Sequence, residues 1–198
     1  MSYVDTPDEA QPDVLRLFEA DRTRQGYVAN YTKVFALRPG VFDAWARLNT
    51  TIKGGMDLRR YELATLAAAR ALRSSYCSLA HATQLRDRFH DTATVYRIAI
   101  DHRSAGLDAA DVSIMDYAAK VATDAAAVTE DDVETLRRHG LSDVEIFDVA
   151  LAAAARCFFS TVLDAVGTRP DHQYRASIEP ELQQALTVGR PIATEGAS

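Results

Sequence analysis

The chain has few of the residues that cross-link a protein or bend its backbone sharply. Its 198 residues include two cysteines, nine glycines and six prolines. Two cysteines do not make a disulfide framework, so each has to be judged as a single thiol. Strand alternation and hairpin dipeptides are also missing, which argues against a β-sheet protein.

The sequence shows no apolar run close to the ~20 residues that span a bilayer. Residues 1–9 lack the basic and apolar regions of a signal peptide. Acidic residues outnumber basic ones, with a net charge of -6 and a pI near 5.3. This balance argues against a general nucleic-acid surface. We therefore expect a cytoplasmic protein that binds neither membranes nor nucleic acids.

Helix signals dominate what is present. Apolar residues recur at helical spacing, and Ser, Thr and Asp stand where helices should begin. Thr129 is one such start, and Ser142 with Glu145 forms a capping-box pattern. The sequence predicts an all-α fold with helices near residues 12–25, 41–53, 58–73, 75–89, 92–101, 108–125, 130–138 and 142–166.

We expect one helical domain over residues 1–180 and a polar, mobile tail over residues 181–198. A weak internal sequence similarity aligns Glu62 with Glu145, and Cys77 with Ser160. If it reflects duplication, the domain contains two related helical halves.

Cys77 and His81 are the most informative pair in the chain. They are four residues apart, so a helix places the thiol and the imidazole on one face. A thiol beside a proton acceptor can reach the thiolate form, which is the nucleophile.

The segment around this pair resembles the alkylhydroperoxidase D and carboxymuconolactone decarboxylase superfamily. That family's peroxidase motif is a glutamate, eleven residues, and then Cys-x-x-Cys-x-x-x-His. Glu62, Cys77 and His81 match the motif, whereas Ser74 stands at the first cysteine. Tyr76 resembles the Tyr-Cys pairing of peroxidase-related members, and the resemblance covers roughly residues 38–172.

The resemblance implies an AhpD-like multi-helix bundle that forms a homo-oligomer, as a dimer, trimer or hexamer. It implies a peroxidase of the alkylhydroperoxidase or peroxiredoxin type, an antioxidant oxidoreductase in which His81 and Glu62 move protons for Cys77. Tyr76 and Ser74 are supporting candidates, and no cofactor is implied. The family's cycle closes a disulfide between its two cysteines. Because Ser74 cannot form one, we expect an external thiol reductant to restore Cys77.

Other readings of these residues stay open. Cys157 is the only internal alternative thiol, but its alanine-rich surroundings predict a buried helix and no resolving role. No second His or Cys lies at ligand spacing for a metal. The chain is alternatively a lyase or isomerase on a small organic acid, with His81 and Glu62 transferring protons. A third reading is a non-catalytic helical oligomer that binds a small apolar ligand.

Overall fold

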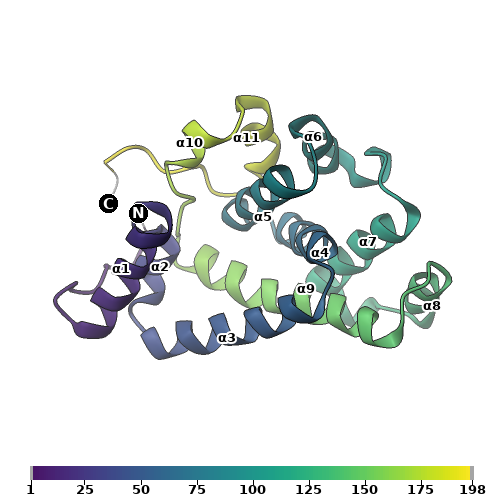
Figure 1. Cartoon of the computed structure of the whole chain (residues 1–198), viewed down its shortest axis with the longest axis horizontal. Helices are drawn as coiled ribbons and strands as arrows, with labels where there is room; N and C mark the ends of the chain where they lie inside the picture. The colour runs from purple at the N-terminus through teal and green to yellow at the C-terminus, as the bar shows by residue number, and fades with distance from the viewer. Residues whose placement is uncertain (1, 197–198) are drawn as a thin grey trace.

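The computed structural model describes residues 2–196, and these residues form an all-α fold without strands. The predicted fold class is therefore confirmed. Figure 1 shows the helices gathered around a central one, labelled α4. The helices are α1 Pro12–Gln25, α2 Asn30–Phe35, α3 Pro39–Gly55, α4 Leu58–Ala71, α5 Ser75–Arg88, α6 Thr92–Asp101, α7 Ala109–Asp124, α8 Glu130–Arg138, α9 Asp143–Ala165, α10 Tyr174–Ser177 and α11 Pro180–Leu186, with short 3-10 turns at His102–Ser104 and Ala125–Ala127.

Side-chain caps fix the starts of α4, α6, α7, α8 and α9. Asp57, Asp91 and Asp108 each accept a hydrogen bond from the backbone N–H three residues further on. Thr129 and Ser142 form complete capping boxes at the starts of α8 and α9. These caps satisfy backbone donors that have no partner within the helix. The predicted starts at these positions are confirmed.

Helix α3 is longer than the sequence predicted. Pro39 opens the helix at its first turn, where a missing N–H does no harm, so it is not a break. At the other end the helix continues through Gly54 and Gly55. Propensity alone disfavours glycine in a helix, and here packing against α9 outweighs it.

Helix α4 is buried on all sides. Every residue from Tyr61 to Ala69 is buried, and the helix packs against α5, α7 and α9. Its alanines have small side chains that allow neighbouring helices to approach closely. The buried face includes Leu63 and Leu66, both fully shielded from solvent. A polar side chain carried by α4 therefore lies inside the protein.

Helix α9 differs from the expectation that no segment is long and apolar enough to span a bilayer. Its 23 residues meet that criterion by length and composition. The helix packs against α4 and α7, and Val149 and Leu163 are shielded from solvent. A core helix of a soluble protein passes the same test, so length and composition are weak evidence for a membrane span.

The two segments aligned by the internal sequence similarity have different local structure. The first copy runs from α4 through a turn at residues 72–74 into α5. The second copy lies within the uninterrupted α9. In the turn, Arg73 has a left-handed φ of 57°, and the Ser74 N–H donates to the Ala69 carbonyl at 2.9 Å. This is a Schellman-type helix end, and it sets the direction in which α5 begins.

The prediction of a polar, mobile tail is wrong for residues 181–193. Helix α11 lies in this segment, and Leu182, Leu186 and Ile192 are buried in the main core. Leu182 and Leu186 are four residues apart in α11 and so lie on one helical face. The segment packs against α5 and α6 and so belongs to the same core. Residues 197–198, also assigned to the tail, lie outside the described residues.

After α11 the chain crosses the α4–α5 turn at very close range. The Gly189 N–H donates to Ser75 Oγ at 2.8 Å, and Arg73 Nε donates to the Val188 carbonyl at 3.3 Å. A Cβ atom on Gly189 would lie 2.0 Å from the Arg73 carbonyl oxygen. Only glycine fits at this crossing without a shift of the backbone.

We predict that Gly189→Ala lowers the free energy of unfolding by about 1–3 kcal/mol, because the added methyl group overpacks a backbone contact. Urea denaturation measures the change. Gly54→Ala is the matched control, since nothing lies within 4 Å of its added Cβ and the position is helical. Equal stability of Gly189→Ala and wild type would contradict the close crossing.

Candidate functional site

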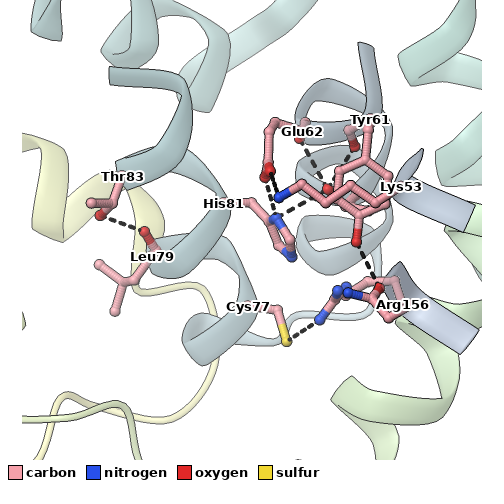
Figure 2. Close-up of polar contacts among 10 residues, drawn as sticks. Lys53, Tyr61, Glu62, Cys77, Leu79, His81, Thr83 and Arg156 are labelled. Carbon is pink, nitrogen blue, oxygen red and sulfur yellow. Dashed lines mark hydrogen bonds and ion pairs between the residues drawn. The ribbon is translucent and has the colours of Figure 1, made fainter. Parts of the chain in front are cut away.

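Glu62 and His81 form a buried pair across two helices. Glu62 is 1% exposed on α4, and His81 lies opposite it on α5. His81 Nδ1 is 2.6 Å from Glu62 Oε2 (Figure 2). An ionised carboxylate only accepts hydrogen bonds, so Nδ1 carries the proton and Nε2 is left with a lone pair. The structure therefore brings together two of the predicted site residues.

Two further side chains hold this pair in place. Thr65 Oγ1 is 3.1 Å from His81 Nδ1 and donates to the Tyr61 carbonyl at 2.7 Å. Lys53 Nζ donates to the other Glu62 oxygen, Oε1, at 2.9 Å. Lys53 also stands 5.2 Å from the centre of the Tyr61 ring. Both oxygens of the buried carboxylate are thus bound, which fixes the orientation of the imidazole.

The environment sets the charges of the pair. Burial raises the pKa of Glu62, but His81 and Lys53 outweigh this, and the pKa is lowered overall. Burial and the nearby Arg156 charge lower the pKa of His81, with Glu62 opposing them only in part. At neutral pH the site therefore holds an ionised Glu62 and a neutral His81 that can accept a proton.

Cys77 lies one turn before His81 on α5 and is 1% exposed. Its sulfur contacts a residue that the sequence did not nominate: Arg156 Nη1 lies 3.4 Å from Cys77 Sγ. Figure 2 shows the second ring nitrogen of His81 on the side of the imidazole that faces Cys77 and Arg156. The thiol therefore stands between a cation and a neutral base.

Aromatic rings enclose the Cys77 and Arg156 side chains. The Arg156 guanidinium carbon lies 5.8 Å from the Trp45 ring centre and 5.4 Å from the Phe159 ring centre. Cys77 belongs to a buried cluster with Phe35 and Phe159. Such a shell keeps water away and strengthens electrostatic interactions inside it.

Tyr76 and Ser74, the supporting candidates, have structural contacts. The Tyr76 hydroxyl donates to Asp171 Oδ2, which ties α5 to the segment before α10. Burial raises the pKa of Tyr76 well above its usual value. Ser74 stands at the N-cap of α5, but its side chain accepts no bond from the helix end. Ser74 thus has the predicted position without the predicted capping bond.

Cys157 is half-buried, and its sulfur points to a different helix. Cys157 Sγ lies 3.8 Å from the Ala122 carbonyl oxygen of α7. Its neighbour Arg156 contacts Cys77, and successive residues are about 100° apart around a helix axis. Both cysteines are free thiols. Within residues 2–196, no group of three or more His, Cys, Asp or Glu side chains is arranged to hold a metal ion.

Arg156 and Lys53 are the residues that sequence reasoning missed. Arg156 interrupts a run of four alanines and two phenylalanines, 152–155 and 158–159, that otherwise reads as buried helix. A single charged residue within such a run is itself a signal of a buried, functional charge. Lys53 gave no comparable signal, because lysine near a helix C-terminus is ordinary.

The comparisons with known proteins agree on a family. Residues 39–105 match the sequence model of the carboxymuconolactone decarboxylase family. Comparison with curated proteins gives no significant match. Among solved structures, the chain is similar to the alkylhydroperoxidase AhpD core of a peroxidase-related protein from Ralstonia eutropha JMP134, with 24% identity, a TM-score of 0.77, and 96% and 98% of the two chains covered.

Two other solved structures are similar. A peroxidase-related protein from Silicibacter sp. TM1040 has 25% identity and a TM-score of 0.79, over 87% of this chain and 93% of that one. The debrominase Bmp8, solved with 2,3,4-tribromopyrrole, has 15% identity and a TM-score of 0.71, over 92% and 95% of the chains. The predicted resemblance to the AhpD-like and carboxymuconolactone decarboxylase superfamily is thus supported by the family model over residues 39–105 and by a fold shared over most of the chain.

Proposed function

We propose that the protein is a peroxidase-like oxidoreductase in which Cys77 is the nucleophile. The observation that carries the proposal is the position of Cys77, in contact with Arg156 and one helical turn from the Glu62-bound His81. Superfamily names span peroxidase-related, decarboxylase and debrominase proteins, so the fold by itself does not choose the reaction. The choice rests on the thiol and its neighbours.

The first half of the proposed cycle oxidises Cys77. The thiol proton passes to His81 Nε2, and the thiolate sulfur attacks one oxygen of a hydroperoxide. The O–O bond breaks, the sulfur becomes sulfenic acid, and the departing alkoxide takes the proton back from His81. Glu62 stabilises the transient imidazolium because its carboxylate accepts from Nδ1. The products are one alcohol, or water from hydrogen peroxide, and Cys77 sulfenic acid.

The second half needs a thiol from outside the chain. Ser74 offers a hydroxyl, which does not undergo thiol exchange, and Cys157 faces α7. An external thiol condenses with the sulfenic acid to a mixed disulfide and releases water. A second thiol then frees Cys77 and leaves as the other half of a disulfide. The proposed reductant is therefore a small thiol or a reduced protein thiol.

The proposal includes a homo-oligomer in the cytoplasm. Exposed apolar side chains on α3 and α9 support an oligomer, since Leu48 is 54% exposed, Val144 70% and Phe147 63%. A purely monomeric species in sedimentation analysis would remove this part of the proposal. The cytoplasmic location rests on the two free thiols.

We predict that Cys77→Ser lowers peroxide turnover with an added small thiol by roughly two orders of magnitude or more, because serine is not oxidised by peroxide. Steady-state consumption of peroxide measures it. Cys157→Ser is the matched control and keeps the wild-type rate. Equal rates in Cys77→Ser and wild type would sink the proposal. A residual activity on an organic acid that survives Cys77→Ser but not His81→Ala would favour the lyase alternative instead.

A second variant restores the missing sulfur. In Ser74→Cys, peroxide treatment should form a disulfide between the introduced thiol and Cys77, because the two positions are three residues apart across the start of α5. Mass spectrometry of the oxidised protein detects the bond. Ser78→Cys is the control, since it introduces an equally buried thiol adjacent to Cys77 in sequence, where the geometry disfavours a bond. Oxidised Ser74→Cys without a disulfide would count against the proposed sulfenic acid chemistry.

The lowered pKa of His81 makes the free energy of unfolding depend on pH. In the unfolded chain a histidine titrates near pH 6.5, whereas folding lowers the pKa of His81. Below pH 6.5 the unfolded state therefore binds more protons, and the free energy of unfolding falls until the lower folded pKa is reached. We predict that His81→Gln makes this fall shallower between about pH 7.5 and about pH 5.5. Urea denaturation at each pH measures it, with exposed His139→Gln as control. An unchanged slope in His81→Gln would show that His81 is not held neutral.

A further inference from the structure

Arg156 is a buried cation that no carboxylate neutralises. The residue is 4% exposed on α9, and its Nε atom is buried without a hydrogen-bond partner. Within residues 2–196, the ion pairs found do not include Arg156. The nearby Glu62 carboxylate is already bound by Lys53 and His81. An unpaired guanidinium inside a protein is strongly unfavourable, so a counter-charge is expected at the group it contacts.

The contact of Arg156 is the sulfur of Cys77, at 3.4 Å. Burial lowers the pKa of Arg156, but Cys77 and Tyr61 outweigh burial and raise it overall. The guanidinium therefore stays charged at any physiological pH. Trp45 and Phe159 pack near it and favour a cation through their ring faces. The same rings restrict water, so the guanidinium acts on the sulfur with little screening.

The charges of the five polar side chains at the site sum to zero when Cys77 is a thiolate. Lys53 is positive, Glu62 negative and His81 neutral, which together give zero. Arg156 adds one positive charge. If Cys77 is a thiol, the five side chains carry one net positive charge, and Lys53, whose side chain is 34% exposed, shares its own charge with solvent.

The other titratable groups around the site do not supply this negative charge. Asp164 is paired with Arg190 at 3.6 Å, and Asp171 is held by Tyr76 and by the Asn30 N–H. Burial raises the pKa of Tyr174 well above its usual value, and Cys77 adds to the effect. The titratable groups on the elements around the Cys77 and Arg156 side chains are Tyr31 of α2, Lys53 of α3, Tyr61 and Glu62 of α4, Tyr76 and His81 of α5, Asp164 of α9, and Asp171 and Tyr174 around α10.

We propose that Arg156 is a positioning residue that holds Cys77 as a thiolate, so that the two side chains form a buried ion pair in the resting protein. This inference deepens the proposed function and rests on it for its purpose, since the thiolate is the form that attacks a peroxide. With Cys77 already ionised, His81 Nε2 can take the proton of the attacked hydroperoxide oxygen and pass it to the departing alkoxide, so the step releases an alcohol and leaves Cys77 as a sulfenate.

The test reads the ionisation of Cys77 directly. Because Cys77 is 1% exposed, the measurement is the ultraviolet absorbance of the thiolate during a pH titration, which needs no reagent to enter the site. The starting protein is Cys157→Ser, which leaves Cys77 as its one thiol. We expect one thiolate at neutral pH, lost on acidification and absent when Cys77→Ser is added.

Replacing the cation should move the titration. In Arg156→Met the midpoint shifts upward by roughly one pH unit or more, and Arg156→Lys restores part of the shift because it keeps the charge. Arg70→Met is the matched control, since Arg70 is a half-buried arginine bound to the Ala185 carbonyl at 2.8 Å. An Arg156→Met midpoint equal to that of the starting protein overturns the inference.

Circular dichroism and peroxide turnover separate a loss of folding or of activity from a change in the ionisation of Cys77. If circular dichroism shows that Arg156→Met is unfolded, the starting protein and Arg156→Lys decide, and a starting protein without thiolate at neutral pH overturns the inference. A thiolate that depends on Arg156 without peroxide turnover supports the inference and removes the proposed function. Peroxide turnover that depends on Cys77, in a protein with no thiolate at neutral pH, supports the proposed function and overturns the inference.

Discussion

The burial of α4 from Tyr61 to Ala69 is the constraint on which the rest of the structure depends. Because α5, α7 and α9 surround this helix, its side chains meet protein on every face. Small residues make that packing possible, and the one carboxylate in the buried stretch, Glu62, has to be neutralised from within. Lys53 of α3 and His81 of α5 do so. The same hydrogen bonds therefore allow the central helix to be buried and fix the orientation of the His81 imidazole.

The site contains two charged systems of different origin. Lys53, Glu62 and His81 form a hydrogen-bonded row in which the Lys53 and Glu62 charges cancel, whereas Arg156 approaches from α9 and contacts the Cys77 sulfur. The two systems meet at the imidazole, whose pKa the Arg156 charge helps to lower. A neutral imidazole and a thiol beside a cation are complementary, because each favours the reactive form of the other. The Trp45 and Phe159 rings pack against each other and lie beside the Arg156 guanidinium.

Sequence reasoning succeeded where the controlling interactions are local. The starts of α4, α6, α8 and α9 depend on a cap and a backbone N–H three residues away, so a short window contains the whole cause. The i, i+4 spacing placed Cys77 and His81 on one face of α5, whereas Glu62 of α4 was nominated by the family resemblance. Sequence reasoning missed α11, whose polar residues hide a single apolar face, and it missed Arg156, whose partner Cys77 is 79 residues away in sequence. Such pairings exist only after the helices have packed.

The crossing of Gly189 over the α4–α5 turn has a consequence for the order of folding. Gly189 and Ser75 are 114 residues apart, so their contact closes one of the largest loops in the chain. During synthesis, α4 and α5 leave the ribosome long before the segment that covers their turn. The contact between that segment and the turn can form only afterwards. Long-range closures of this kind form late and slowly. The turn that precedes Cys77 is therefore closed only after residue 189 has been made.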